Sequence, residues 1–240
     1  MRSVITSGCD MPRNPERVPE WERLLSSAAH LQDVLPGAVL VGGTAAAIHA
    51  EHRFSMDADH VLTDLRDRFD AVLMQLESVA GWKTARVARP VQILGSLAGI
   101  QTGVRQLIRT EPLETTTLEV RGMALTIPTQ AEILRIKGVL ILKRNATRDY
   151  LDFVALAAHM GARATGEALR SFDRLYPQES GESALQQLQT QLANPLPFDL
   201  DDSDLSQYRD LTPQWRDWEK VKSACGRVAV ETFDHVCDAT

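Results

Sequence analysis

The chain has 240 residues, of which 44% are hydrophobic and 24% charged, as expected for a globular protein with a sizeable core. No apolar run approaches the ~20 residues of a membrane-spanning helix, and the N-terminal residues lack the apolar stretch of a secretory signal. The three cysteines form neither a CxxC metal pattern nor a disulfide framework, so we expect a cytoplasmic protein without a membrane partner.

Charge is unevenly distributed along the chain. The formal net charge is −6, yet residues 83–148 contain eleven basic and four acidic side chains, a local balance of +7. A basic middle between acidic ends suits a polyanionic ligand. A solvated sheet face rich in arginine explains the same numbers equally well.

The first half of the chain alternates helical and extended patterns, after about a dozen residues that we expect to be loosely attached. Pro36-Gly37 separates the first two elements. In chain order the pattern predicts a helix over 19–35, a buried strand over 38–41, a helix over 44–52, a strand within 54–62, and a helix capped by Thr63 or Asp64.

The second half begins with β-rich segments and ends in helices. Strands are predicted at 91–97, 104–108, 115–120 and 123–127, completing a mixed sheet. Helices are predicted after Thr129, near Thr147 and after Thr212-Pro213, where Trp215 and Trp218 should pack in the core. We therefore expect an α/β (α+β) core over residues 1–127, followed by a mostly helical C-terminal region over residues 128–240.

Two short motifs in the core carry the first functional signal. Gly42-Gly43-Thr44 forms a turn at a helix start, where backbone N–H groups and the helix dipole favour an anion such as a triphosphate. Asp57 and Asp59 are two residues apart on a strand, so both carboxylates project from one face, as a Mg²⁺ site requires. A phosphate turn followed by a metal pair indicates chemistry on a nucleotide, although each motif alone is common in unrelated proteins.

A second group of charged residues lies in the helical region. Lys137 is flanked by apolar residues and should face inward, where it needs an anionic partner such as a phosphate. Arg148 and Asp152 are four residues apart on a helix and should share a face, either in a catalytic role or as a structural ion pair. In either case, the negative charge of Asp149 at the helix start interacts favourably with the helix dipole.

The two groups together resemble the nucleotidyltransferase superfamily, and within it the abortive-infection toxins (AbiEii/AbiGii type). The HRxSxDxD element of those toxins stands here as residues 52–59, and their Lys…Arg…RDxxD elements match Lys137, Arg144 and residues 148–152. The resemblance implies the nucleotidyltransferase fold and catalytic roles for Asp57, Asp59, Lys137 and Asp152, with Asp57 and Asp59 as metal ligands. It also implies nucleotide binding by Gly42, Gly43, Thr44, Arg53, Ser55, Arg144 and Arg148.

The function implied by this resemblance is Mg²⁺-dependent transfer of a nucleoside monophosphate from an NTP to an acceptor. The acceptor would be the 3′ end of tRNA, and an antitoxin protein would be the partner. Two alternatives stay open. The predicted strands between residues 91 and 108 contain no third carboxylate, as expected of a nucleotide- or RNA-binding module with a degenerate site. A transferase acting on a small molecule, such as an antibiotic, is the other alternative.

Overall fold

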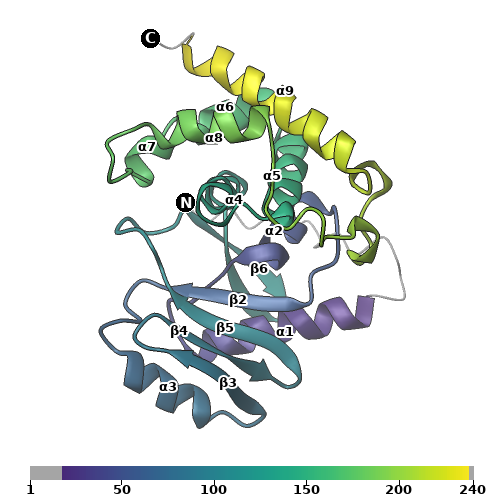
Figure 1. Ribbon diagram of the computed structural model, residues 1–240. Coiled ribbons are helices and arrows are strands. Elements are labelled where there is room, and N and C mark those ends of the chain that lie inside the picture. The colour runs from purple at the N-terminus through teal and green to yellow at the C-terminus, as the bar shows by residue number, and fades with distance from the viewer. Residues whose placement is uncertain (1–17, 238–240) are drawn as a thin grey trace. The chain divides into compact units, whose positions relative to one another are not determined.

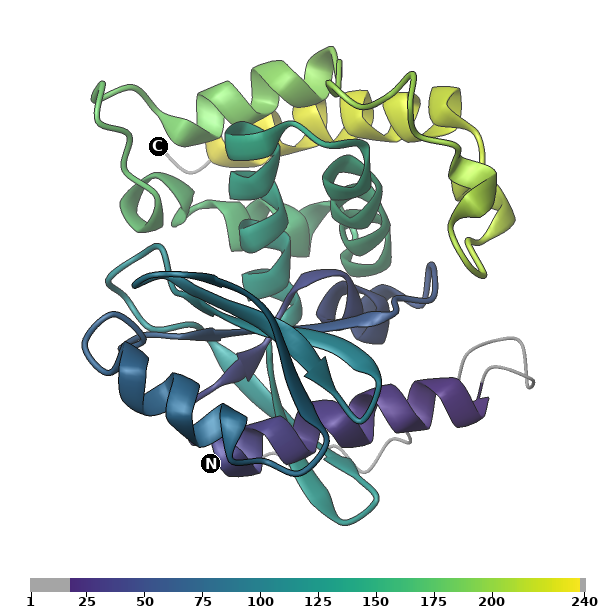
Figure 2. The ribbon, with the colours of Figure 1, turned by 60° about the horizontal axis from the view of Figure 1, so that its bottom comes forward.

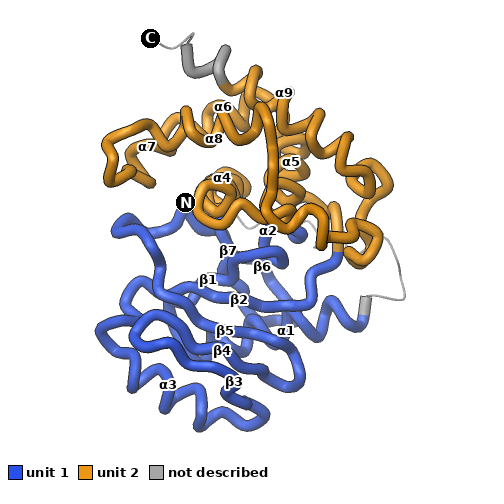
Figure 3. The backbone as a smooth tube through the Cα atoms, in the orientation of Figure 1, with its two compact units in different colours: residues 1–48, 54–129 blue, residues 49–53, 130–240 orange. Residues whose placement is uncertain are grey.

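The computed structural model describes residues 18–237, with side chains described from 19 to 232, so the expectation for the first dozen residues lies outside it. The chain divides into two compact units (Figure 3). Unit 1 comprises residues 1–48 and 54–129, and unit 2 comprises residues 49–53 and 130–240. The division at 129/130 lies two residues beyond the boundary predicted from sequence, and the short segment 49–53 belongs to the helical unit.

Unit 1 contains a mixed five-stranded sheet of order β1-β2-β5-β4-β3 (Figure 1). Only the β2–β5 pair is parallel among these strands, and the other neighbours are antiparallel. The strands are β1 (Val39–Leu40), β2 (Asp57–Leu62), β3 (Trp82–Ala88), β4 (Gln92–Leu97) and β5 (Ile100–Gln106). This confirms the α/β fold with a mixed sheet.

Two helices, α1 (Val18–Val34) and α3 (Phe69–Glu77), cover one face of this sheet (Figure 2). Their apolar residues form a core with alternate residues of the strands, such as Leu62, Ile93 and Val104. Because side chains alternate across a strand, the residues between these core positions project from the opposite, open face. Asp57 and Asp59 of β2 are among them, since Ala58 and His60 are fully buried.

Three local expectations were wrong in detail. Strand β3 was not predicted, because its five central residues are exposed and show no apolar alternation. The strands β6 (Thr115–Val120) and β7 (Met123–Pro128) pair only with each other in a separate two-stranded sheet. Helix α3 begins at Phe69, after a turn at residues 63–68, and not at Thr63 or Asp64.

Unit 2 is built from helices. Helix α4 is buried between α5, α6 and α8, and α9 packs on α5, α6 and α8. The helices are α4 (Gln130–Arg144), α5 (Thr147–Met160), α6 (Ala162–Leu169), α7 (Phe172–Leu175), α8 (Ala184–Ala193) and α9 (Trp218–Cys237), with 3-10 turns η2 (Leu205–Gln207) and η3 (Pro213–Trp215). Trp215 is buried and Trp218 stacks edge-on against Tyr150, which confirms their packing role. None of the helices in the described part of the chain has the length and apolar content needed to cross a bilayer.

His60 makes the stability of unit 1 sensitive to acid. It is fully buried on β2, and burial lowers its pKa from 6.5 to about 4. A lowered pKa means that the unfolded chain takes up a proton below pH 6.5 while the folded chain does not. The free energy of unfolding should therefore fall by about 3 kcal/mol as the pH drops from about 7.5 to about 4. Urea unfolding of wild type and His60→Leu across this range measures the difference, and equal pH dependence in both would contradict it.

Candidate functional site

The glycine turn and the carboxylate pair lie side by side in unit 1. The Val41 amide donates to the Asp59 carbonyl over 2.8 Å, which places the end of β1 beside the start of β2. Gly42 then adopts a left-handed backbone with φ of 75°, a conformation that favours glycine. A Cβ at this position would stand 3.8 Å from Asp59 Oδ2, so the Asp59 carboxylate faces the turn.

Helix α2 (Gly42–Ala50) starts at this turn, two residues earlier than predicted. Thr44 is fully buried, and its hydroxyl donates to the Asp57 carbonyl over 2.5 Å. The Thr44 side chain thus fixes the helix start against β2, and its hydroxyl proton is already used. The backbone N–H groups in the first turn of the helix have no partner within the helix, and they are the donors that an anion would meet.

The donor chemistry of the carboxylate pair fits a hard cation. Mg²⁺ is commonly held by one or two carboxylates together with substrate phosphates and water. Among the described side chains, those of residues 19–232, no group of three or more His, Cys, Asp or Glu could hold a metal ion, so Asp57 and Asp59 would act as a pair. The positions beside them on β5, Gln101 and Gly103, supply no third carboxylate.

A buried ion cluster occupies unit 2, with Asp152 at its centre. Asp152 is completely buried, and Arg53 donates to both of its oxygens, from Nε over 2.7 Å and from Nη2 over 3.0 Å. Lys137 Nζ lies 2.6 Å from Oδ2, and His52 Nε2 lies 2.7 Å from Oδ1. Lys137 therefore faces inward as predicted, and a carboxylate already serves as its anionic partner.

Asp149 is the second anion of the cluster. Lys137 Nζ lies 3.3 Å from Asp149 Oδ1, and Arg144 donates to both oxygens of the same carboxylate. Asp149 is completely buried, so it does more than favour the helix dipole at the start of α5. Three cations and two carboxylates give the cluster, with His52 neutral, one excess positive charge.

The protonation states follow from burial and from these contacts. Burial alone would raise the pKa of Asp152, but the charges of Arg53 and Lys137 outweigh it and hold that pKa well below its usual value. Burial lowers the pKa of His52 and outweighs the opposing effect of the Asp152 carboxylate. The Asp152 carboxylate is therefore ionised, and it holds Arg53 and Lys137 in place through these contacts.

The remaining predicted residues lie apart from this cluster or at its edge. Arg148 is exposed while Asp152, one turn further along α5, is fully buried and pairs with Arg53 and Lys137. Ser55 is buried just before β2. Sequence reasoning missed Tyr208, whose ring lies 5.8 Å from the Arg53 guanidinium, and the burial of His52. The sequence places Arg53 directly after His52, and it places Asp149 and Asp152 on a distant helix, but no spacing rule links the two segments.

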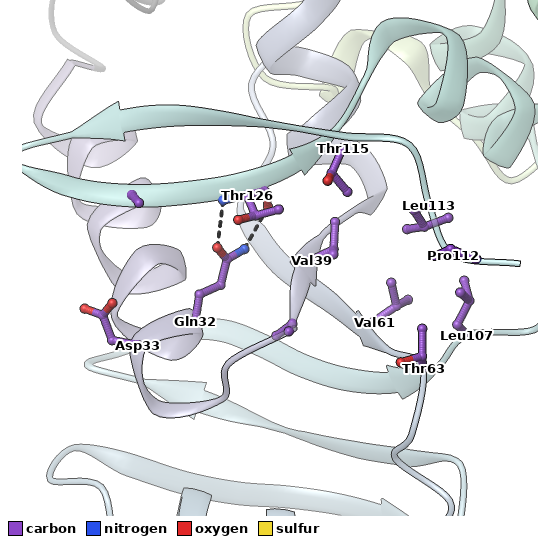
Figure 4. Close-up of a pocket in the computed structure, with 13 residues that line it drawn as sticks. Gln32, Asp33, Val39, Val61, Thr63, Leu107, Pro112, Leu113, Thr115 and Thr126 are labelled. Carbon is purple, nitrogen blue, oxygen red and sulfur yellow. Dashed lines mark hydrogen bonds between the residues drawn. The ribbon is translucent and has the colours of Figure 1, made fainter. Parts of the chain in front are cut away.

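Unit 1 also contains a cavity of about 430 Å³ beyond the carboxylate pair (Figure 4). Val39 and Val61, which pair across β1 and β2, line it together with Thr115 and Thr126 of the small sheet. Gln32 closes one side through two hydrogen bonds to the Thr126 backbone, at 2.7 and 2.8 Å. Val61 is two residues from Asp59 on the same strand, so its side chain projects from the face that carries the carboxylates. Its volume is within the range of small-ligand sites.

Comparison with known sequences gives matches to part of the chain. No protein-family model matches it. The mycolic acid-containing lipids exporter MmpL11 of Mycolicibacterium smegmatis is 39% identical over 129 residues, which is 52% of this chain and 13% of that protein. The heme uptake protein MmpL11 of Mycobacterium tuberculosis is 40% identical over 129 residues, with the same coverage. The chain thus spans about an eighth of the length of these curated relatives.

Comparison with solved structures covers nearly the whole chain. A protein of Helicobacter pylori described as a nucleotidyltransferase has a TM-score of 0.58 at 16% identity, over 95% of this chain and 99% of that one. JHP933 from Helicobacter pylori has a TM-score of 0.55 at 16% identity, over 94% and 95% of the two chains. At this level of identity the likeness concerns the fold, and the fold of this chain is that of the nucleotidyltransferases.

Proposed function

We propose that the chain is a Mg²⁺-dependent nucleotidyltransferase. The observation that carries this proposal is the orientation of the Asp59 carboxylate toward the Gly42 turn within a nucleotidyltransferase fold. The turn offers backbone donors to a triphosphate, and Asp57 and Asp59 offer the oxygen ligands that a Mg²⁺ ion takes beside phosphates. Bound there, the metal would neutralise charge on the phosphates during transfer.

The proposed reaction is an in-line displacement at the α-phosphorus of an NTP. An acceptor hydroxyl oxygen forms the new P–O bond, the bond to the β-phosphate oxygen breaks, and pyrophosphate leaves with the bonding electron pair. The acceptor hydroxyl loses its proton, which a side chain or water must accept. In this chemistry most of the catalysis comes from positioning and electrostatic stabilisation, which the turn and the carboxylate pair supply.

The buried ion cluster supports anion binding in unit 2. Its excess charge is carried by Arg53 and Arg144, whose side chains are 10% and 36% exposed, while Lys137, Asp149 and Asp152 are at most 1% exposed. We propose that Arg53 and Arg144, with the exposed Arg148, present cationic edges to a phosphate. Asp149 and Asp152 hold two of these guanidinium groups through bidentate contacts, which reduces the entropy lost on binding.

The proposed acceptor and protein partner follow from the sequence resemblance. We propose the 3′ end of tRNA as acceptor and a protein antitoxin as partner, as in the abortive-infection toxins. The decisive experiment incubates the chain with each α-³²P-labelled NTP, Mg²⁺ and total tRNA, and separates the products on a denaturing gel. We expect label in RNA from at least one NTP, together with one pyrophosphate released per nucleotide. Absence of label from tRNA, protein and aminoglycoside alike, for all four NTPs, would refute the transferase.

A second candidate, a nucleotide-binding module without turnover, is favoured by one observation. Gln101 and Gly103 stand beside the carboxylate pair on β5, so no third carboxylate is available there. This candidate predicts Mg²⁺-dependent NTP binding by calorimetry with no pyrophosphate release. The same samples used for the transfer assay separate the two candidates.

A further inference from the structure

The open face of the five-stranded sheet carries basic side chains that the nucleotide site does not use. The strand register arranges this face in three cross-strand rows, read from β2 through β5 and β4 to β3 (Figure 1). The rows are Asp57–Gln101–Ser96–Lys83, Asp59–Gly103–Leu94–Arg86 and Val61–Arg105–Gln92–Ala88. The carboxylate pair therefore lies on β2, Arg105 lies on the adjacent strand β5, and Lys83 and Arg86 lie on β3 at the far edge of the sheet.

A β-bulge brings Lys83 and Arg86 to the same face. The register shifts between Thr84 and Arg86, so Ala85 has no partner on β4. Residues three apart on a regular strand would point to opposite faces, but the extra residue restores the alternation. Lys83 consequently pairs with Ser96 and Arg86 with Leu94, both on the open face.

These three cations have no carboxylate partner in the described part of the chain. Most other basic residues between 83 and 148 do: Arg89 pairs with Asp70, Arg121 with Glu22, Arg135 with Glu132, and Lys137 and Arg144 with Asp149. Lys83, Arg86 and Arg105 are exposed and form no ion pair with any described residue. The Gln92 amide, turned so that its oxygen faces the guanidinium, accepts from Arg105 over 3.1 Å and steadies it.

A triphosphate at the Gly42 turn is not the anion that Lys83 and Arg86 would bind. Its triphosphate must lie at the Gly42 turn, which follows β1 on one side of β2. Lys83 and Arg86 are on β3, three strands away on the other side, a separation of about 14 Å at the usual strand spacing. An anion that contacts Lys83 and Arg86 would therefore be a second one, and to reach the carboxylates it would extend from β3 across β4 and β5.

We propose that this face, defined by Lys83, Arg86 and Arg105, binds the phosphate backbone of a nucleic-acid acceptor and leads its reacting end to Asp57 and Asp59. This inference rests on the proposed function and identifies the surface that would hold its acceptor. Regularly repeated phosphates match cations placed on two strands, β3 and β5, with β4 between them. The same charges repel a polycationic antibiotic, so the small-molecule alternative is disfavoured.

The test is binding of fluorescein-labelled total tRNA, followed by anisotropy in EDTA without NTP at several salt concentrations. Three lost phosphate contacts should lower the slope of log K against log salt by about 2 to 3. The variant combines Lys83→Gln, Arg86→Gln and Arg105→Gln. The control combines Arg23→Gln, Lys222→Gln and Arg227→Gln, with the same charge change at exposed positions on α1 and α9. The control should keep the wild-type slope.

The outcomes separate this inference from the proposed function. The inference is supported if the slope of log K against log salt decreases only in the variant with Lys83→Gln, Arg86→Gln and Arg105→Gln. The same measurement with a labelled DNA duplex shows whether RNA or DNA is preferred. Equal slopes in both variants, or equal competition by polyglutamate, would overturn it even if the wild type transfers nucleotides. Specific tRNA binding without transfer of label from any NTP would instead refute the proposed function and leave the binding face standing.

Discussion

Replacing Asp59 with asparagine should lower the rate of nucleotide transfer by about 10³-fold or more, because the metal that balances phosphate charge loses an anionic ligand. Asp59 is the member of the pair whose carboxylate faces the Gly42 turn. Asparagine keeps the shape and one oxygen ligand, so part of the loss should be recovered at higher Mg²⁺ concentrations. Initial rates of pyrophosphate release at several Mg²⁺ concentrations measure both effects.

Asp67→Asn is the matched control for this prediction. Asp67 is an exposed acid in the same unit, in the turn before α3, and its replacement changes net charge equally. It should leave the rate within a factor of about two, as for a surface substitution that shifts stability by at most ~0.5 kcal/mol. Thermal unfolding of both variants should match wild type. An Asp59→Asn rate equal to that of Asp67→Asn would remove Asp59 from the metal site.

The turn and the carboxylate pair could be predicted from sequence because both depend on neighbouring residues. A glycine pair after an apolar run predicts a turn into a helix, and i, i+2 alternation predicts that Asp57 and Asp59 share a face. The structure adds that Asp59 faces Gly42, a contact that the antiparallel pairing of β1 with β2 creates. The local sequence pattern therefore predicts the turn and the carboxylate pair, whereas the pairing of β1 with β2 brings them side by side.

The buried ion cluster could not be predicted in the same way. Helical periodicity placed Lys137 inward, but its partners come from the next helix, at residues 149 and 152. Arg53 and His52 are about a hundred residues from Asp152 in sequence, so no spacing rule connects them. The basic residues of the open face could not be predicted for a related reason. A bulge in β3, a strand that the sequence did not predict, decides to which face Lys83 and Arg86 point.

Replacing Asp152 with alanine should lower the free energy of unfolding by about 3 to 5 kcal/mol, because the substitution leaves buried cations without their counter-charge. Arg53 loses both of its hydrogen bonds, and Lys137 keeps only the 3.3 Å contact with Asp149. Urea unfolding near neutral pH measures the effect. Glu167→Ala, which breaks the exposed Arg163–Glu167 pair, is the control and should change stability by less than about 1 kcal/mol.

The pH dependence of this loss identifies the ionised carboxylate as its cause. A pKa held below the unfolded value of 3.8 contributes stability that is present above that value and disappears as the pH falls through the folded pKa. The difference between wild type and Asp152→Ala should therefore be constant above about pH 5 and shrink in stronger acid. A double variant, Asp152→Leu with Lys137→Met, should recover the part of the stability lost through Lys137, since apolar side chains can replace a buried ion pair at little cost, while Arg53 stays without its carboxylate. If that folded variant still transfers nucleotides, Asp152 and Lys137 serve the stability of the helical unit. If transfer is lost while stability returns, the cluster acts on the substrate.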